Sequence, residues 1–167
     1  HSAAITKDGS LYMWGWNHYG QLGDGTTTSY RYTPVKIMDN VASVSLGGIH
    51  SAAITKDGSL YKWGGGDKTR PHRVASNVQS VELGDVHTTV ISKDGGLYTW
   101  GYNYYGQLGN GTTTKSSNPI KIMNDVVSCA GGYYHTIALK KDGAVYTWGR
   151  NNCGQLGNGT TTDRTSP

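Results

Sequence analysis

A segment of 15 residues occurs four times in this chain and limits the possible folds more than any other feature. In every copy a Trp follows the first His by 13 residues, and each His after the first copy follows a Pro by 16 residues. The step from Trp to the next Pro varies instead, from 8 to 20 residues. Constant spacing indicates a rigid framework, whereas variable spacing indicates a surface loop, because loops absorb changes of length at low entropic cost. The copies begin at His1, His50, His87 and His135.

Within this framework the sequence predicts short β-strands joined by tight turns. Each Lys-Asp-Gly triplet is predicted to be a hairpin turn, because Asp-Gly readily supplies the positive φ that such turns need. Strands are expected before and after this turn, after each Pro and before each His. Four antiparallel strands in 37 to 49 residues are typical of a propeller blade, and no segment shows the sustained 3.6-residue period of a helix. In the first part of the chain the expected strands are 3–5, 11–14, 35–38 and 41–44.

The loop between Trp and Pro carries a second motif. It reads NHYGQLGDGTTT from Asn17, NYYGQLGNGTTT from Asn103 and NNCGQLGNGTTT from Asn151. Together with H-[ST]-x-x-[IL]-x-K-D-G-x-[LV]-Y-x-W-G, it strongly resembles the repeat of the regulator of chromosome condensation family over essentially the whole chain. The resemblance implies an all-β fold of four-stranded antiparallel blades, as in a seven-bladed β-propeller. This chain departs from the family pattern in its second unit, where residues 64–70 replace the GQLG loop.

The chain holds about three and a half such units, expected at 1–49, 50–86, 87–134 and 135–167 of a single partial propeller. The first unit lacks the strand that elsewhere precedes the His, and the fourth stops at Pro167, where its last strand should begin. We therefore expect two four-stranded blades flanked by two three-stranded ones, in an open arc that exposes apolar blade faces. The remainder of a propeller on a longer parent chain, or a second copy, is expected to cover these ends.

The repeated His and Trp residues are interpreted as structural. Each occurs once per unit at the same place, so the His side chains should be too far apart to share a metal ion. The Trp rings should be buried wedges between blades, and Trp100→Ala is expected to destabilise by about 3–5 kcal/mol. We expect no metal and no cofactor. This structural set comprises His1, His50, His87, His135, Trp14, Trp63, Trp100 and Trp148.

Two further residue types invite chemical interpretations that the sequence does not favour. The Asp of each Asp-Gly turn is expected to accept local backbone hydrogen bonds rather than to act as a general base. Cys129 and Cys153 fall in different parts of the repeat and are not expected to form a disulfide. No nucleophile, base and orienting group form a catalytic constellation, so an enzyme is the least favoured function. The four turn residues are Asp8, Asp57, Asp94 and Asp142.

Composition excludes several classes of protein. Only 16% of residues are charged, which excludes a coiled coil and a charge-rich disordered chain, and the 25 Gly residues follow no collagen period. No apolar stretch approaches the roughly 18 residues of a membrane span. The net charge of +4 is too small, and too little clustered, to favour nucleic-acid binding. Low charge and loops rich in Thr, Asn and Tyr favour a bacterial secreted or cell-surface protein.

Large and mutually unlike residues in the variable loops are the candidates for partner binding. Exposed Tyr and Trp supply contact area at low entropic cost, although the same residues could simply cover the base of each loop. A basic group in the second unit, Lys68, Arg70, His72 and Arg73, is interpreted as a solvated turn. Asn110-Gly-Thr and Asn158-Gly-Thr are N-glycosylation sequons, but the turn itself also needs such residues. The partner-binding candidates are Trp16, His18, Tyr19, Tyr102, Tyr104, Tyr105 and Arg150.

The leading functional hypothesis is a non-catalytic scaffold that binds a protein partner through these loops. A glycan is a lesser alternative as ligand. The resemblance implies a second function, nucleotide exchange on a small GTPase or association with chromatin or nucleic acid. However, the chain has no insertion or basic tail of the kind that the founding family member uses for those partners.

Overall fold

The repeats form β-strands because their short apolar runs are bounded by turn residues, as the sequence predicts. In the computed structural model, which describes residues 1–66 and 68–167, fourteen strands and no helix are present. Asp67, in the short loop of the second repeat, lies outside the described residues. The strands are β1 (Ser2–Ile5), β2 (Leu11–Trp16), β3 (Tyr30–Met38), β4 (Val41–Leu46), β5 (His50–Thr55), β6 (Leu60–Gly64), β7 (Lys68–Ala75), β8 (Val78–Leu83), β9 (His87–Ser92), β10 (Leu97–Gly101), β11 (Ser116–Met123), β12 (Val126–Gly131), β13 (His135–Lys140) and β14 (Val145–Gly149).

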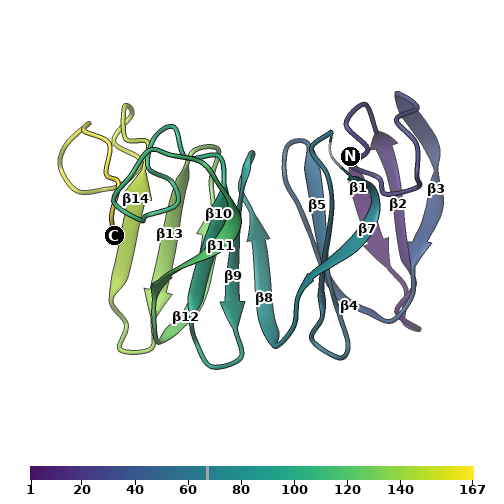
Figure 1. Cartoon of the computed structure of the whole chain (residues 1–167), viewed down its shortest axis with the longest axis horizontal. Coiled ribbons are helices and arrows are strands. Elements are labelled where there is room, and N and C mark those ends of the chain that lie inside the picture. The colour runs from purple at the N-terminus through teal and green to yellow at the C-terminus, as the bar shows by residue number, and fades with distance from the viewer. Residues whose placement is uncertain (67) are drawn as a thin grey trace. The chain divides into compact units, whose positions relative to one another are not determined.

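The described strands assemble into four antiparallel sheets, each made of neighbours in sequence (Figure 1). Two sheets have three strands, in the orders β1-β2-β3 and β12-β13-β14, and two have four, in the orders β4-β5-β6-β7 and β11-β10-β9-β8. The predicted all-β class and the two complete and two three-stranded blades are thus confirmed. The arrangement of the sheets in an open arc stays a prediction.

The Lys-Asp-Gly turns are hairpin turns closed by hydrogen bonds within the repeated segment itself. In the first, the Gly9 N–H donates to the Thr6 carbonyl at 2.9 Å, and Gly9 alone takes positive φ, at 93°. The Asp8 carboxylate accepts from the hydroxyls of Thr6 and Ser10, and these hydrogen bonds lower the pKa of Asp8. This carboxylate serves the turn that it sits in. The equivalent Asp57 accepts from the hydroxyls of Thr55 and Ser59, whereas Asp94 accepts from the Ser92 hydroxyl and has Gly96 at the position of Ser10.

Three of the four Pro residues lie inside the outer strand of a sheet, whereas the sequence placed that strand after the Pro. Pro34 lies within β3, Pro71 within β7 and Pro119 within β11. The pairing of each outer strand with its neighbour shifts register near the Pro, between Met13 and Gly15 in the first sheet. Pro lacks an N–H, so it is tolerated on an outer strand where the ladder is already interrupted.

The chain divides into two compact units, His1–Val81 and Glu82–Pro167, and each has its own core. The core of the first contains Leu11, Met13, Leu22, Val41, Ala53 and Trp63. The core of the second contains Ile91, Leu97, Val126, Ala138 and Trp148. Four positions of the repeat recur in both: the Leu after the turn, the Val that starts the pre-His strand, the Ala three residues after His, and the Trp. Each core therefore packs one sheet against the next through the same repeat positions.

Candidate functional site

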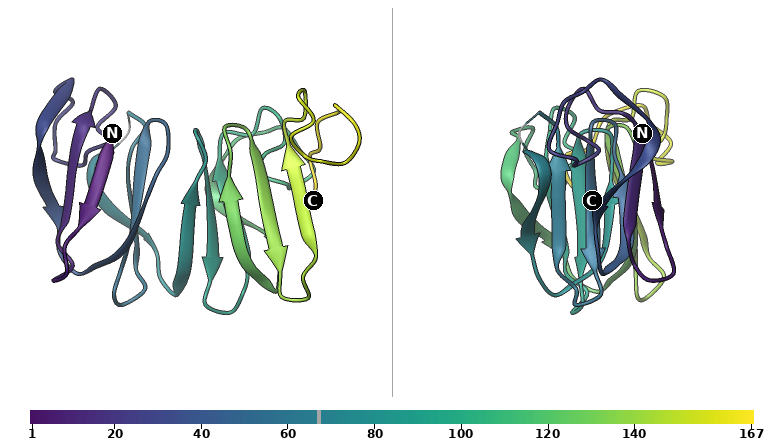
Figure 2. Two further views of the ribbon diagram at one scale, coloured as in Figure 1. Left: turned by 180° about the vertical axis from the view of Figure 1, so that it is seen from behind. Right: turned by 90° about the vertical axis from the view of Figure 1, so that its right-hand side faces the viewer.

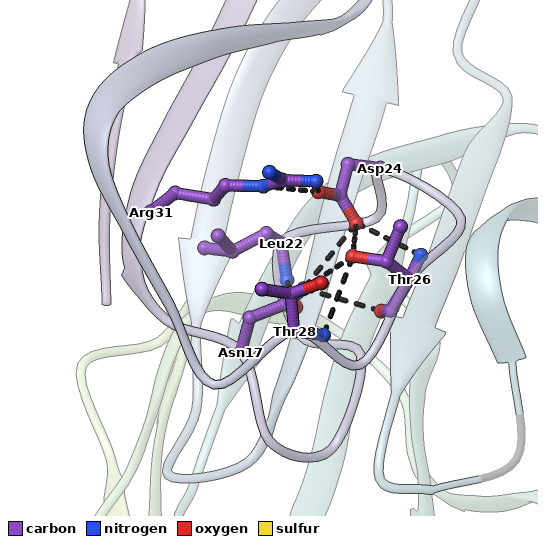
Figure 3. Close-up of polar contacts among 6 residues, drawn as sticks. All are labelled: Asn17, Leu22, Asp24, Thr26, Thr28 and Arg31. Carbon is purple, nitrogen blue, oxygen red and sulfur yellow. Dashed lines mark hydrogen bonds and ion pairs between the residues drawn. The ribbon is translucent and has the colours of Figure 1, made fainter.

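A buried Asn closes the loop that follows Trp in the first repeat (Figure 3). Asn17 is fully buried, and its Oδ1 accepts the Leu22 N–H at 2.9 Å. Its Nδ2 donates to the Thr26 carbonyl at 3.1 Å and to Asp24 Oδ1 at 3.3 Å. Asp24 in turn accepts from the N–H and hydroxyl of Thr26. One amide thus satisfies backbone groups on both arms of the loop, which a buried loop requires.

The same network recurs in the third and fourth repeats. Asn103 Oδ1 accepts the Leu108 N–H at 2.9 Å, and Asn151 Oδ1 accepts the Leu156 N–H at 3.0 Å. In both loops the Asn Nδ2 donates to a Thr carbonyl at 2.9 Å. The sequence analysis did not single out these Asn residues, although each stands three positions after its Trp. That repeated spacing was the signal that could have identified them.

The GQLG segments of the first and third repeats each hold the next sheet through a backbone carbonyl. Within the first unit, the Gln21 carbonyl accepts the Trp63 indole Nε1–H at 2.9 Å and the Ser51 hydroxyl at 2.7 Å. Within the second, the Gln107 carbonyl accepts Trp148 Nε1–H at 2.9 Å and the Thr136 hydroxyl at 2.8 Å. The loop therefore connects consecutive sheets by hydrogen bonds as well as by packing.

Two of the repeated His residues, His1 and His87, lie at the same junctions. His1 Nε2 lies 2.9 Å from the Ser51 hydroxyl, and His87 Nε2 lies 3.0 Å from the Thr136 hydroxyl. His87 is fully buried and His50 nearly so, whereas His135 is half-buried. Among the described residues, no three His, Cys, Asp or Glu side chains are grouped as a metal site would need.

The four repeated Trp side chains are not equally buried. Trp63, Trp100 and Trp148 are buried, with 1%, 6% and 0% of their surface exposed. Trp14 is only half-buried, contrary to the expectation that all four are covered. Trp63 and Trp148 each bind the GQLG loop of the preceding repeat.

Exposed and half-buried Tyr side chains gather with one Arg on the loops of the second compact unit, in a group that we call the Tyr cluster: Tyr102, Tyr104, Tyr105, Tyr133, Tyr134 and Arg150. The ring centroids of Tyr102 and Tyr104 are 6.5 Å apart, and those of Tyr105 and Tyr134 are 4.9 Å apart. The Arg150 guanidinium lies 4.9 Å from the Tyr105 ring centre, within the range of a cation–π contact. Tyr102, Tyr104 and Tyr133 expose 52%, 74% and 61% of their surface.

A smaller aromatic group lies on the first compact unit, at the end of β2 and in the loop that follows it. Trp16 and Tyr19 meet edge to face with centroids 5.4 Å apart, and His18 stacks on Trp16 at 6.5 Å. All three side chains are exposed. On β3, Tyr30 stacks on Tyr32 at 6.2 Å. The three loop residues are thus brought together within their own unit.

The structure brings the four second-unit candidates, Tyr102, Tyr104, Tyr105 and Arg150, into the Tyr cluster. Sequence reasoning missed Tyr133 and Tyr134, which supply the other rings. They directly precede His135, at a position where the second repeat has Gly48 and Ile49 instead. That difference inside a constant frame was the available signal. Partner binding by all of these residues stays a prediction.

The sequence matches two family profiles described as "Regulator of chromosome condensation (RCC1) repeat". The first covers residues 8–54 and 94–139, and the second covers residues 78–107 and 126–155. The matches include more than half of the chain. It belongs to the RCC1 repeat family.

Curated relatives share single RCC1 repeats with this chain. The ultraviolet-B receptor UVR8 of Arabidopsis thaliana is 51% identical over 37 residues, which are 22% of this chain and 8% of the receptor. RCC1 domain-containing protein 1 of Homo sapiens is 59% identical over 29 residues, which are 17% of this chain and 8% of that protein. These matches therefore reflect the repeat rather than the whole proteins.

Solved RCC1-type structures match nearly the whole chain. Human WBSCR16 superposes with a TM-score of 0.88 at 26% identity, over 99% of this chain and 49% of that one. Prp20p of Saccharomyces cerevisiae superposes with a TM-score of 0.86 at 24% identity, over 99% and 47% respectively. The chain thus spans about half the length of these structures. In the described part of the chain, no helix has the length and apolar character needed to cross a membrane.

A groove of about 640 Å³ lies within the first unit, between the outer strands of two RCC1-repeat sheets. Ile37 and Met38 of β3 line one side, and Arg70 and Pro71 of β7 line the other. None of the partner-binding candidates lines it. The basic group of the second repeat belongs to strand β7 and is not the solvated turn that we expected. Gly64, Gly65 and Gly66 precede this strand, and all three adopt positive φ.

Within the motif that begins at Asn17, Asp24 is the one residue whose charge differs from its counterparts in the loops of the third and fourth repeats, Asn110 and Asn158. Its side chain is 4% exposed and lies 2.8 Å from the Arg31 guanidinium. Burial raises the pKa of Asp24, but hydrogen bonds from Thr26 and Arg31 outweigh burial and bring the pKa below its usual value. The folded state therefore favours the ionised carboxylate.

This shift predicts that acid weakens the first unit through Asp24. A carboxyl whose pKa is lower in the folded than in the unfolded state stabilises the fold fully above the unfolded pKa of about 3.9. This stabilisation is lost as the pH falls through the folded pKa. We expect Asp24→Asn to lose about 1–3 kcal/mol at neutral pH and much less at an acid pH below the folded pKa of Asp24, since the carboxylate is then protonated in the wild type too. Urea unfolding at both pH values measures this, and an equal loss at both would contradict the assignment.

The two thiols should differ in reactivity. Burial raises the pKa of Cys129 to about 11, with its Sγ 3.3 Å from the Thr89 hydroxyl, whereas Cys153 is exposed. The thiolate is the reactive form, so at about pH 8 a thiol reagent should label Cys153 quickly and Cys129 only after denaturation. Mass spectrometry of the labelled peptides measures both sites. Rapid labelling of native Cys129 would contradict its burial.

Proposed function

We propose that this RCC1-repeat chain is a non-catalytic scaffold that binds a protein partner through the Tyr cluster. The observation that carries the proposal is the exposure of Tyr102, Tyr104 and Tyr133, each more than half accessible, in a group of touching rings. Exposed apolar groups of this kind are uncommon on a monomer surface without a binding role. Tyr and Arg are also the residue types that dominate binding energy at interfaces.

The repeat frame does not require these rings. In the fourth loop, Arg150, Asn152 and Cys153 stand at the positions of Tyr102, Tyr104 and Tyr105, yet the buried Asn network is the same. The rings also lie outside the two hydrophobic cores. Since neither the buried Asn network nor the hydrophobic cores use these rings, their aromatic character supports a role in partner contact.

Affinity purification with the whole chain as bait tests the proposal. The key variant is Tyr102→Ser, Tyr104→Ser and Tyr133→Ser combined, and the matched control is Tyr32→Ser, an 89% exposed Tyr outside the cluster. We expect the triple variant to lose a reproducible partner at least about tenfold in affinity and the control to keep it, because central aromatic residues dominate interfaces. Circular dichroism confirms that both variants fold. Retention of the partner by the triple variant would overturn the proposal.

Prp20p, whose solved structure was reported with its binding to Gsp1p and histones, supplies the alternative function. The alternative is nucleotide exchange on a small GTPase, or association with chromatin or nucleic acid. Two measurements separate it from the scaffold: release of labelled GDP from a small GTPase, and the salt dependence of DNA binding. Accelerated GDP release, or DNA binding that falls steeply with salt and ignores the Tyr variants, would favour the alternative.

A further inference from the structure

The rings of the Tyr cluster form one continuous row. The ring centroids of Tyr102 and Tyr104 are 6.5 Å apart, with their planes 21° from parallel. The Tyr105 centroid lies 6.4 Å from that of Tyr104 and 4.9 Å from that of Tyr134. The centroids of Tyr134 and Tyr133 are 4.5 Å apart. The row therefore joins two loops that are distant in the sequence into one surface.

The two loops that carry the row lie at the same end of the strands. One loop follows β10, and the other joins β12 to β13. Figure 2 shows the loops of the second unit at one end of its strands and the hairpin turns at the other end. Tyr102 and Tyr104 are exposed, beside the half-buried Tyr105 and Tyr134. The exposed pair belongs to the third repeat, which has other repeats on both sides in this sequence.

The cluster offers flat apolar faces and hydrogen-bond donors to a partner. Each Tyr has a hydroxyl that can donate, and the Arg150 guanidinium, which lies over the Tyr105 ring, has donors and no acceptor. The cluster itself contains no carboxylate and no amide side chain. The amide of Asn103, in the same loop, is fully buried and bonded to the Leu108 N–H and the Thr112 carbonyl. A suitable partner therefore presents acceptors and flat apolar groups.

A polyproline II (PPII) segment meets this requirement. It makes no internal hydrogen bonds, so its carbonyls are free to accept, and each Pro brings an apolar ring and no N–H. Two residues of PPII advance about 6 Å, close to the 6.5 and 6.4 Å between the first three rings of the row. An added β-strand would need a sheet edge, and an amphipathic helix would need an apolar groove. The cluster lies on loops and contains no aliphatic side chain, so it suits neither of them.

We propose that the Tyr cluster recognises a proline-rich PPII segment that carries an acidic residue beside its prolines. The Tyr rings stack against the Pro rings, the Tyr hydroxyls donate to the carbonyls of the segment, and the Arg150 guanidinium pairs with the acidic side chain. This inference rests on the proposed function, because it names the chemistry of the partner that the same surface binds.

Fluorescence anisotropy of labelled peptides mixed with the whole chain is the test. The probes are decaproline, decaproline preceded by Glu-Glu, decaproline preceded by Lys-Lys, and a Gly-Ser peptide of equal length, which is a flexible coil. Labelled cellohexaose is a parallel probe for a glycan ligand. We expect saturable binding of the proline peptides and none of the Gly-Ser peptide or the glycan. At low salt the Glu-Glu form should bind at least about threefold more tightly than the Lys-Lys form.

Four variants separate the parts of the interaction. Tyr102→Ser combined with Tyr104→Ser should weaken binding at least about tenfold, because faces and hydroxyls are both lost. Tyr102→Phe combined with Tyr104→Phe should bind with intermediate affinity, because only the hydroxyls are lost. Arg150→Gln should bind the Glu-Glu and Lys-Lys forms equally. Tyr32→Ser, which changes an 89% exposed Tyr of the first unit, should bind as the wild type does. Circular dichroism confirms that each variant folds.

The outcomes distinguish this inference from the proposed function. Decaproline binding that the double Ser variant loses and Tyr32→Ser retains supports the inference. No saturable binding of any proline peptide, or binding that the double Ser variant retains, overturns it. Binding of cellohexaose that depends on the Tyr residues, without binding of decaproline, also overturns it. If the partner from the affinity purification depends on the Tyr cluster but contacts it through a segment without prolines, this inference fails and the proposed function stands. If neither experiment finds binding that depends on the Tyr residues, both fail.

Discussion

Trp148→Ala should destabilise the second unit by about 3–5 kcal/mol, the usual loss for a fully buried large aromatic residue. Trp148 is 0% exposed, packs with Leu97, Val126 and Ala138, and donates its indole N–H to the Gln107 carbonyl. Its removal leaves a cavity between two sheets and a carbonyl with one donor fewer. Urea unfolding followed by circular dichroism measures the loss.

Two other Trp residues provide the controls for this experiment. Trp14 is half-buried, so Trp14→Ala should cost less, about 1–2 kcal/mol. Trp16 is 37% exposed and lies outside the cores, so Trp16→Ala should cost under about 1 kcal/mol. A loss under about 1 kcal/mol for Trp148→Ala, equal to that for Trp16→Ala, would show that the repeated Trp is not a wedge between sheets.

Gly109→Ala should destabilise by about 2–4 kcal/mol through a close contact with the same indole. Gly109 has a φ of 77°, and a Cβ there would lie 2.6 Å from Trp148 Nε1. Gly157 is the same position of the fourth loop, with a φ of 67° and nothing within 4 Å of an added Cβ. Gly157→Ala should therefore show only the cost of positive φ, about 1 kcal/mol. Denaturant unfolding of both variants isolates the contact, and equal losses would mean that the indole moves aside.

The strands were predictable because each copy of the repeated segment can be compared with three other copies. The constant spacing from His to Trp predicted the hairpin, and the constant spacing from Pro to His predicted the strand before His. The prediction that the outer strand begins after the Pro was wrong for a physical reason. Pro34 was treated as a strand boundary, but an outer strand with shifted pairing accommodates it. The basic residues of β7 were misjudged because the short loop before them obscured where the strand begins.

The candidate site was predictable only in part, because binding residues do not repeat. Tyr102, Tyr104 and Tyr105 stood out against a constant frame, whereas Tyr133 and Tyr134 occupy a different loop, and only the fold brings Tyr134 to within 4.9 Å of Tyr105. The exposure of each ring also depends on its neighbours in space rather than on its sequence position. Spacing alone could not supply either observation.

The hydrogen bond that orders the tip of each full loop is donated by the main chain. The N–H of Tyr19 donates to Gln21 Oε1 at 2.8 Å, that of Tyr105 to Gln107 Oε1 at 3.0 Å, and that of Cys153 to Gln155 Oε1 at 2.9 Å. An N–H is present whatever the side chain, and this position already holds both Tyr and Cys. Mutation can therefore change what the loop displays without weakening the bond that shapes it. Such a chain can acquire a new binding specificity by single substitutions while its architecture is inherited intact.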